Sequence, residues 1–272
     1  MAKAAKQTAY AITVDHLTKQ FKDFTAVNDI SFRVKQGELF ALLGPNGAGK
    51  STTIKMLTTL LKPTSGELTL AGHDVLHAQD AARKAFGIVF QDPSVDTEMT
   101  AYENMALHAA LYGVKGSETN ARIQTLLELV ELWDRKDTLV KNFSGGMKRR
   151  LEIARGLLHH PHVLFLDEPT LGLDTQTRNL LWDYVKRLSR EEGMTVFFTT
   201  HYLEEAEAVA ERIAIIDHGQ LIAMGTTKEL TQQTGTKTLE EAYLALTGKM
   251  VRDETPSKGD EWRARRRSRM MR

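Results

Sequence analysis

The stretch GPNGAGKST at residues 44–52 constrains the fold of this chain more than any other feature of its sequence. It fits the pattern of glycine, four residues and Gly-Lys-Ser, which holds phosphate when it lies between a strand and a helix. The apolar run at 39–43 predicts a strand buried on both faces, and the pattern at 49–60 predicts a helix. We therefore expect an α/β fold with this loop at the carboxyl end of a buried strand.

The residue types in this loop suit a chain of phosphates. Its glycines let backbone N–H groups turn toward phosphate oxygens, and the amino end of the following helix adds a partial positive charge. Lys50 can bring a full charge to the terminal phosphates, and the hydroxyl of Ser51 suits Mg²⁺. A glycine-rich turn without a ligand is the alternative, but the flanking elements favour the phosphate site. The candidate binding residues are Gly44, Pro45, Asn46, Gly47, Ala48, Gly49, Lys50, Ser51 and Thr52.

Further along the chain, short apolar runs alternate with a helical pattern. Residues 163–166 and 196–199 predict buried strands, and apolar residues between 180 and 188 recur at helical spacing. This alternation is typical of a parallel sheet with crossover helices. Near the start, residues 10–14 and 30–34 alternate apolar with other side chains, which predicts an antiparallel sheet.

The middle and the end of the chain have different patterns. Between about residues 93 and 142, apolar side chains recur at helical spacing without a strong strand signal, which predicts a helical insert. Residues 213–222 predict a hairpin, and a short helix is expected at about 239–246. The expected fold class is α/β, with a mostly parallel core sheet, an N-terminal antiparallel β subdomain and a helical insert subdomain.

Two acidic residues follow the predicted strand at 163–166. Asp167 and Glu168 would lie at the carboxyl edge of the sheet, where open α/β sheets bind ligands. Asp167 can hold Mg²⁺ through water, and Glu168 can orient an attacking water or accept its proton. Two acids before Pro169 could instead form a solvated turn, which would be the preferred interpretation without the phosphate loop. Together with the loop, they predict hydrolysis of a phosphate bond.

Composition argues against several other classes of protein. The chain has no cysteine, which removes disulfides, thiolate nucleophiles and zinc-thiolate sites. Its formal net charge of +1 argues against broad long-range attraction of nucleic acid or lipid. Residues 1–21 lack the apolar segment of a secretory signal, and no apolar run approaches the ~20 residues that cross a bilayer. We therefore expect a protein that stays inside the cell and forms no pore alone.

The last residues of the chain are strongly basic. We expect residues 252–272 to form a disordered tail, because the arginines between 263 and 272 are balanced only by Glu261. A solvated tail, a contact with anionic lipid of the inner leaflet, and a contact with nucleic acid are the alternatives for its role.

The segment NFSGGMKRRLEIARGLL resembles the signature motif of ATP-binding-cassette (ABC) proteins, whose usual form is Leu-Ser-Gly-Gly-Gln. Phe143 and Met147 depart from that form. Taken alone, the segment predicts an amphipathic helix with a serine N-cap. After a phosphate loop and before the acidic pair, it favours the family. The intact core of the motif is Ser144, Gly145 and Gly146.

The resemblance extends to single residues elsewhere. It implies that Gln91 senses Mg²⁺ and the attacking water, that Asp174 communicates across a dimer, and that His201 contacts the terminal phosphate. Phe21 matches the aromatic residue that stacks on adenine, although tyrosine is commoner there. Each residue also has an ordinary alternative. Gln91 could be a solvated glutamine and Asp174 a helix cap. His201 could simply precede a helix, and Phe21 could be a core aromatic. The implied catalytic residues are Glu168, His201 and Gln91, and the implied metal ligands are Ser51, Gln91 and Asp167.

The resemblance spans residues 12–253 and implies a function for the whole chain. It implies a P-loop NTPase core that binds and hydrolyses ATP with Mg²⁺, in a nucleotide-binding domain at 1–251 with a helical subdomain at about 93–158. Two copies, identical or homologous, would close on ATP so that the signature loop of one acts on the nucleotide of the other. The pair would dock on a membrane-spanning permease at the inner face of the cell membrane.

The signature helix and the later TLEEAYLALTG resemble the branch that exports drugs, polysaccharides and lipid-linked compounds. One alternative is a nucleic-acid-associated ABC ATPase, but the chain has neither long heptad arms nor a second cassette. Another is a GTP-driven switch, for which the Asn-Lys-any-Asp motif is missing. We expect no nucleic acid partner, and the sequence does not specify the cargo.

Overall fold

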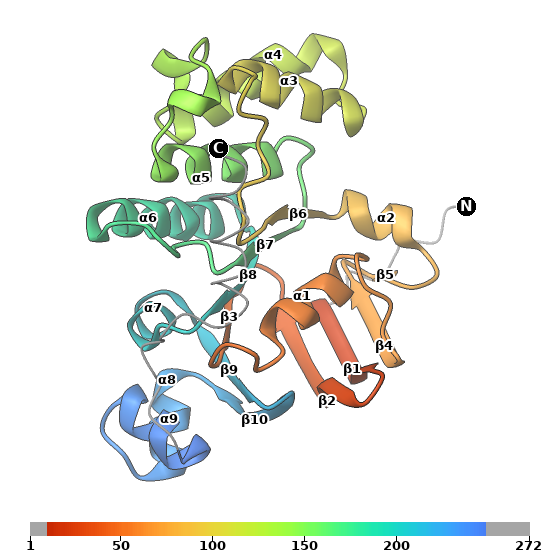
Figure 1. Ribbon diagram of the computed structural model, residues 1–272, viewed down its shortest axis with the longest axis vertical. Helices are drawn as coiled ribbons and strands as arrows, with labels where there is room; N and C mark the ends of the chain where they lie inside the picture. Colours follow the sequence, from red (N-terminus) through yellow and green to blue (C-terminus); the bar gives the residue numbers. More distant parts are fainter. Residues whose placement is uncertain (1–9, 249–272) are drawn as a thin grey trace, which may run out of the picture.

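The computed structural model of this chain describes residues 10–248. The predictions for the basic tail at 252–272 lie outside these residues. Two sheets and the helices around them make up the described part (Figure 1). The sheets are called the central sheet and the N-terminal sheet below.

The central sheet has the strand order β10-β9-β3-β8-β7-β6. All neighbouring strands in it are parallel except β10, which runs antiparallel to β9. This confirms the predicted core of mostly parallel strands, including the hairpin near its edge. Its strands are β3 (Leu39–Leu43), β6 (Phe86–Val89), β7 (Val163–Asp167), β8 (Thr195–Thr200), β9 (Arg212–Asp217) and β10 (Gln220–Gly225).

The N-terminal sheet has the order β2-β1-β4-β5 and is antiparallel, as predicted. In its register Val14 pairs with Phe32 on one side and with Leu68 on the other, so the buried residues of three strands share a face. Strands β4 and β5 had no counterpart among the sequence predictions. The strands are β1 (Tyr10–Phe21), β2 (Phe24–Lys35), β4 (Ser65–Leu70) and β5 (His73–Asp74).

Helices lie on both sides of the central sheet. Figure 1 shows α3 and α4 farthest from the N-terminal sheet, with α5 and α6 between them and the central sheet. Within residues 10–248 no helix has the length and apolar character needed to cross a membrane. The α-helices are α1 (Lys50–Leu57), α2 (Gln79–Lys84), α3 (Ala101–Leu111), α4 (Gly116–Leu129), α5 (Gly145–Gly156), α6 (Thr175–Glu192), α7 (Leu203–Val209), α8 (Thr227–Thr234) and α9 (Leu239–Thr247), and short 3₁₀ turns cover Trp133–Arg135 and Val140–Asn142.

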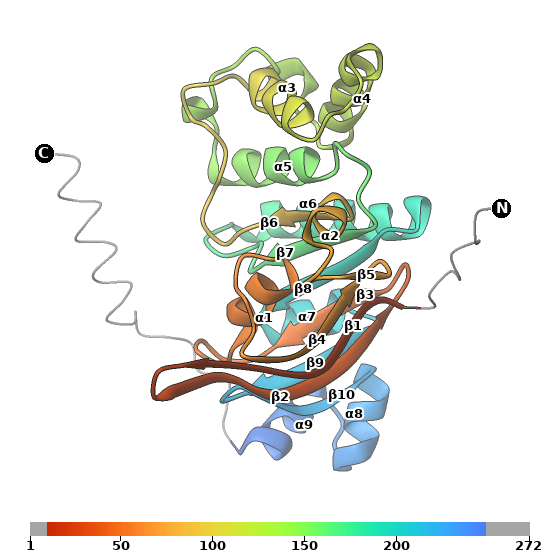
Figure 2. The same cartoon turned by 90° about the vertical axis from the view of Figure 1, so that its right-hand side faces the viewer.

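The central sheet separates two hydrophobic cores because its side chains alternate between its faces. In β3, Leu39, Ala41 and Leu43 join the core shared with the helical insert and α6. Phe40 and Leu42 point the other way, into the core shared with α1 and the N-terminal sheet. Figure 2 shows α1 between the two sheets. The phosphate loop is therefore supported from both sides.

The strand order decides which loops meet at the carboxyl edge of the central sheet. Strand β8 lies between β3 and β7 and pairs in parallel with both. At that edge Leu43 pairs with Thr200, and Thr199 pairs with Asp167. The ends of these three strands thus bring the phosphate loop, the acidic pair and the residues after β8 together.

Candidate active site

The phosphate loop joins β3 to α1 and passes very close to its neighbours. A Cβ atom at Gly44 would lie 2.1 Å from the carbonyl oxygen of Ile216 in β9. Gly49 has φ of 106°, and a Cβ there would lie 2.6 Å from the carbonyl oxygen of Ala26 in β2. Both positions therefore require glycine. Helix α1 begins directly afterwards at Lys50, so its amino end faces the loop.

Lys50 is buried and links the loop to the acidic pair. Its Nζ donates hydrogen bonds to the carbonyl oxygens of Gly44 at 2.7 Å and Pro45 at 3.0 Å. The same Nζ lies 3.1 Å from Oε1 of Glu168, and both side chains are almost fully buried. An ammonium group in this position faces the space that the loop surrounds and can exchange these partners for phosphate oxygens.

Asp167 ends strand β7 beside the first turn of α1. Its Oδ1 accepts hydrogen bonds from the hydroxyls of Thr199 at 2.6 Å and Ser51 at 3.1 Å. Burial raises the pKa of the Asp167 carboxyl above its ordinary value, although both hydroxyls oppose this change. A cation beside Asp167 would stabilise its charged form, and the oxygen atoms gathered here are of the kind that Mg²⁺ binds.

Glu168 follows with φ of 46°, in the left-handed region that few residues other than glycine adopt. Its N–H donates to the carbonyl oxygen of Thr199 at 3.2 Å and to the Thr199 hydroxyl at 3.0 Å, which holds this conformation. Burial alone would raise the pKa of the Glu168 carboxyl, but His201 and the charge of Lys50 outweigh it, so the pKa lies below its ordinary value. Glu168 is therefore a carboxylate at neutral pH.

His201 comes directly after β8. Its Nδ1 lies 3.4 Å from Oε1 of Glu168 without the alignment of a hydrogen bond. Three sequence-predicted elements therefore meet within one cluster: the phosphate loop with Lys50 and Ser51, the pair Asp167 and Glu168, and His201.

Two residues of this region escaped sequence reasoning. Thr199 contacts both acidic residues from the neighbouring strand β8. Glu205 in α7 is buried and accepts hydrogen bonds from the hydroxyls of Thr170 and Thr200, which ties the segment after Glu168 to the segment before His201. The threonines of the buried strand β8, at 195, 199 and 200, were the available signal, because buried hydroxyls need partners.

The signature segment and Asp174 lie at the amino ends of two neighbouring helices. Ser144 is the N-cap of α5 and accepts a hydrogen bond from the N–H of Met147 at 3.2 Å. Asp174 is the N-cap of α6, and its carboxylate accepts hydrogen bonds from the N–H of Thr177 at 2.9 Å and its hydroxyl at 2.7 Å. These bonds lower the pKa of Asp174. A Cβ at Gly146 would lie 2.3 Å from the Thr177 side chain, so the two helix starts touch.

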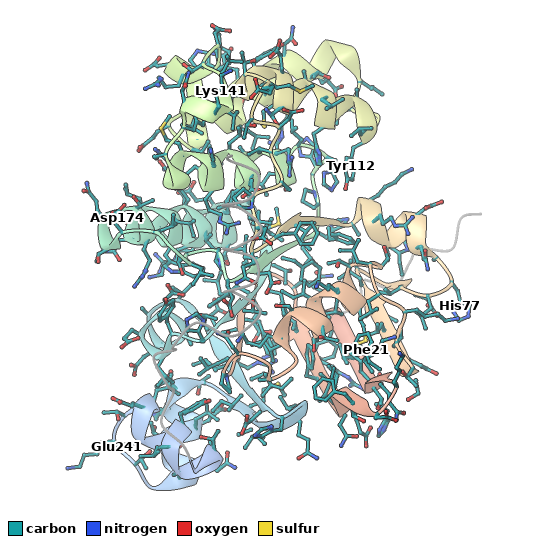
Figure 3. All side chains as sticks on the ribbon, viewed as in Figure 1. Phe21, His77, Tyr112, Lys141, Asp174 and Glu241 are labelled. Carbon is teal, nitrogen blue, oxygen red and sulfur yellow. The ribbon has the colours of Figure 1, made fainter. Side chains whose placement is uncertain are left out.

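Exposure distinguishes this second cluster from the first. Ser144, Gly145 and Asp174 are exposed, whereas Lys50 and Glu168 are buried. Figure 3 shows Asp174 at one edge of the molecule, at the start of α6. The capping roles that sequence analysis gave as ordinary alternatives for Ser144 and Asp174 are therefore present, and they leave the amino end of α5 open to a second molecule.

Gln91 and Phe21 lie on elements other than those that carry the first cluster. Gln91 follows β6, its side chain is half-buried, and its carbonyl oxygen accepts a hydrogen bond from Arg149 of α5 at 2.9 Å. Phe21 ends β1 with an exposure of 44%, and Nζ of Lys19 lies 4.9 Å from its ring centre. Figure 3 shows Phe21 on the side of the molecule that carries α1 and the N-terminal sheet. It is therefore an exposed aromatic and no core residue.

A separate cavity of about 420 Å³ lies beside the segment that follows Gln91. Its wall includes Ser94 of that segment, the stacked rings of Tyr112 and His159, and the guanidinium groups of Arg83 and Arg155. The cavity thus adjoins the loop that follows β6 and contains Gln91.

Comparison with known proteins identifies a family and its members. The family model described as ABC transporter matches residues 27–171. The chain is 44% identical over 233 residues to the daunorubicin/doxorubicin resistance ATP-binding protein DrrA of Streptomyces peucetius, covering 86% of this chain and 70% of that protein. It is 42% identical to the linearmycin resistance ATP-binding protein LnrL of Bacillus subtilis, covering 84% and 73%. It is 41% identical to the Nod factor export ATP-binding protein I of Burkholderia thailandensis, covering 81% and 72%.

Solved structures show the same fold. The chain resembles the structure of an ATP-binding subunit of an ABC transporter with a TM-score of 0.79 and 31% identity, covering 87% of this chain and 99% of that one. It also resembles the dimeric ATP-binding cassette MJ0796 bound to ADP and Pi in a post-hydrolysis state. There the TM-score is 0.71 and the identity 29%, covering 79% of this chain and 98% of the cassette.

Proposed function

This chain belongs to the ABC transporter family, and we propose that it is the ATP-hydrolysing subunit that drives an export transporter. The observation that carries the proposal is the convergence of Lys50, Asp167 and Glu168 at the carboxyl edge of the central sheet. Relatives named for drug resistance and for Nod factor export support the export direction. Under this proposal residues 1–251 act as one nucleotide-binding domain, with the helical subdomain at about 93–158.

ATP would bind with its phosphates in the loop at 44–52. Lys50 would give up the carbonyl oxygens of its own loop and contact the terminal phosphates, where a full charge is most useful. Phe21, exposed and beside the loop-supporting strands, would stack on adenine. A Mg²⁺ ion held by Ser51, Asp167 and Gln91 would neutralise phosphate charge, and the hydroxyl and carboxylate oxygens 3.1 Å apart suit it.

Glu168 would then orient the attacking water and accept its proton. Its low pKa keeps it charged, and once Lys50 turns to the phosphates its Oε1 becomes available to a water molecule. His201, beside Oε1 of Glu168, would contact the terminal phosphate. The strained backbone at Glu168 supports this role, because unusual backbone conformations gather at catalytic positions.

A second copy would complete the site. Ser144 and Gly145 are exposed at the amino end of α5, where N–H groups and the helix dipole favour a phosphate. They would close on the γ-phosphate of ATP bound to the partner, with Asp174 at the same interface. Each of two copies carries a full set of these residues, so a dimer would have two competent sites, whether the partner is identical or homologous.

Closure of the dimer on ATP would move a membrane-spanning permease docked on it. This subunit would therefore lie at the inner face of the cell membrane. The cavity of about 420 Å³ beside Ser94 supports docking at the segment that follows Gln91. The alternative of a nucleic-acid-associated ATPase gains no support from the relatives, whose names refer to resistance and export.

The variant Glu168→Gln tests the proposed function. We expect it to bind ATP normally and to hydrolyse it about 10²–10⁴-fold more slowly, because it lacks the proton acceptor. Because the bound ATP is not hydrolysed, size-exclusion chromatography with light scattering should give the molar mass of a dimer. Near-normal turnover would contradict the assignment of Glu168, and a monomer at saturating ATP would contradict the shared site. Glu67→Gln, an exposed glutamate of β4, is the matched control and should behave as the unchanged chain.

A further inference from the structure

Two charged residues of α5 are buried although they lie outside the candidate catalytic cluster. Arg149 is 5% exposed and Glu152 is 1% exposed, and Nη1 of Arg149 lies 3.1 Å from Oε2 of Glu152. Most charged side chains stay at the surface because burial removes their hydration, a loss that only good pairing can offset. A buried pair on a helix that could have used apolar residues therefore needs a reason.

The remaining bonds of this pair all reach one segment outside the helix. Arg149 donates hydrogen bonds to the carbonyl oxygens of Phe90 and Gln91, the latter at 2.9 Å. Glu152 accepts hydrogen bonds from the N–H and the hydroxyl of Ser94, the latter at 3.1 Å. Residues 90–94 follow β6 and have no helix or strand hydrogen bonds of their own. Arg155 of the same helix also donates hydrogen bonds to the carbonyl oxygen and the hydroxyl of Ser94. Arg149 and Glu152 are therefore the side chains of α5 that hold the segment at Phe90 and Gln91, and they share Ser94 with Arg155.

The same helix carries the signature loop at its amino end. Ser144 caps α5, and Arg149 and Glu152 follow about one and two turns later. A helix of this length moves as a rigid rod, so a displacement of its amino end also displaces the two side chains. Their hydrogen bonds would carry that displacement to the backbone of Gln91.

We propose that Arg149 and Glu152 are positioning residues that make the placement of Gln91 depend on how the signature loop of the same subunit engages the nucleotide of its partner. This rests on the proposed function, since it needs a dimer that closes on ATP. Closure of the dimer at one nucleotide site would then place Gln91 in the other site. The two sites would therefore hydrolyse ATP together. The pair would thus make the dimer cooperative without any direct contact between the two nucleotides.

The test replaces both charged side chains by uncharged side chains of similar length, so that α5 keeps a similar packing volume. In the variant Arg149→Met with Glu152→Met, we expect the affinity for ATP to stay within about threefold. In the Glu168→Gln background, ATP should still produce the dimer, because Ser144 to Gly146 are untouched. With Glu168 intact, turnover at saturating ATP should fall about tenfold or more, and the Hill coefficient should fall from about 2 to about 1.

Two further variants separate positioning from folding. Arg149→Lys keeps the charge but lacks the planar guanidinium, whose two separate nitrogens reach the carbonyl oxygens of Phe90 and Gln91. We therefore expect an intermediate Hill coefficient even if the double variant folds poorly. Arg150→Gln is the matched control, because Arg150 bonds to the carbonyl oxygen of Val130 and to Glu131 and not to residues 90–94. It should keep both turnover and cooperativity.

The outcomes separate the inference from the proposed function. Unchanged cooperativity in folded Arg149 variants, a fall in turnover at an unchanged Hill coefficient, or loss of the ATP-driven dimer would each overturn the positioning role. An unchanged chain that hydrolyses no ATP would contradict the proposed function itself. Loss of cooperativity with the dimer retained supports the inference, because a general loss of stability would weaken dimerisation as well.

Discussion

One atom of Lys50 links the phosphate loop to the carboxylate of Glu168. Its Nζ contacts two carbonyl oxygens of the loop and Oε1 of Glu168 within 3.1 Å. The side chain therefore lies where the terminal phosphates are expected, among partners that a phosphate can replace. Its burial makes it a poor candidate for a surface role and a good one for ligand binding.

Removal of this ammonium group should weaken nucleotide binding. For Lys50→Ala we expect an affinity for ATP about 10–100-fold lower, because a hydrogen bond to a charged group contributes roughly 1.5–3 kcal/mol. Isothermal titration calorimetry measures the dissociation constant directly. Lys55→Ala changes an exposed lysine of the same helix and should leave the constant unchanged. An equal constant in both variants would count against the assignment of Lys50.

Thr199 shows how one hydroxyl can place two acids. It donates to Asp167 and accepts from the N–H of Glu168. In Thr199→Val, a near-isosteric change, we expect a loss of about 1–3 kcal/mol in the free energy of unfolding, because two buried polar groups lose their partner. Turnover should also fall, since Glu168 loses its support.

The control for this change is on the same strand. Thr195 is buried at the other end of β8, and its hydroxyl accepts a hydrogen bond from the N–H of Gly37. Thr195→Val should lower the free energy of unfolding in urea by a comparable amount without slowing hydrolysis. If both variants lost activity equally, instability alone would explain the effect of Thr199.

At the scale of elements, the amino ends of α5 and α6 are stabilised by their caps and, under the proposed function, face a second copy. Asp174 caps α6 through Thr177, which is enough to explain an acid at this position. Asparagine caps a helix about as well as aspartate does, whereas alanine does not. Comparing Asp174→Asn with Asp174→Ala therefore separates the capping of α6 from a function that needs the negative charge.

We expect Asp174→Ala to cost about 1 kcal/mol in the free energy of unfolding and Asp174→Asn to cost little. If Asp174 communicates across the dimer, Asp174→Asn should still slow ATP turnover at normal stability. Thermal unfolding and steady-state hydrolysis, measured on the same preparations, give both quantities. Full activity in Asp174→Asn would reduce the role of Asp174 to a helix cap.

Element prediction succeeded where the local pattern was long or strongly apolar. The buried strands β3, β7 and β8 and the helices of the insert were predicted from such patterns. Strands β4 and β5 and helices α2 and α8 were missed. Strand β5 has two residues and α2 has six, too few for a hydrophobic period to stand out. In β4 only Leu68 and Leu70 are buried, which gives a single repeat.

At the scale of the whole molecule, the exposed signature loop predicts a site shared between two copies. Ser144→Arg should block the loop, and Lys50→Ala should disable the phosphate site, so each variant alone should hydrolyse little ATP. A mixture of the two can form one intact site, from the phosphate loop of the first and the signature loop of the second. We therefore expect mixing to restore part of the turnover.

Subunit mixing thus decides between shared and self-contained sites. If each copy used its own signature loop, both variants would stay inactive in any mixture. Ser144→Arg also removes an N-cap, worth about 1 kcal/mol, so its unfolding should be measured alongside. Its affinity for ATP as a single copy should be close to that of the unchanged chain.

The sequence by itself determined the local chemistry of this protein: a loop for phosphates, an acid pair at the end of a buried strand, and a capped helix with the signature core. These features depend on neighbours in the chain, so residue order and spacing are enough to recognise them. The tertiary structure alone decided that β8 lies between β3 and β7, which places Thr199 beside both acids. It also decided that Arg149 and Glu152 hold residues 90–94. Strand order and hydrogen bonds between distant residues depend on contacts made throughout the folded chain. A local sequence pattern therefore cannot predict them.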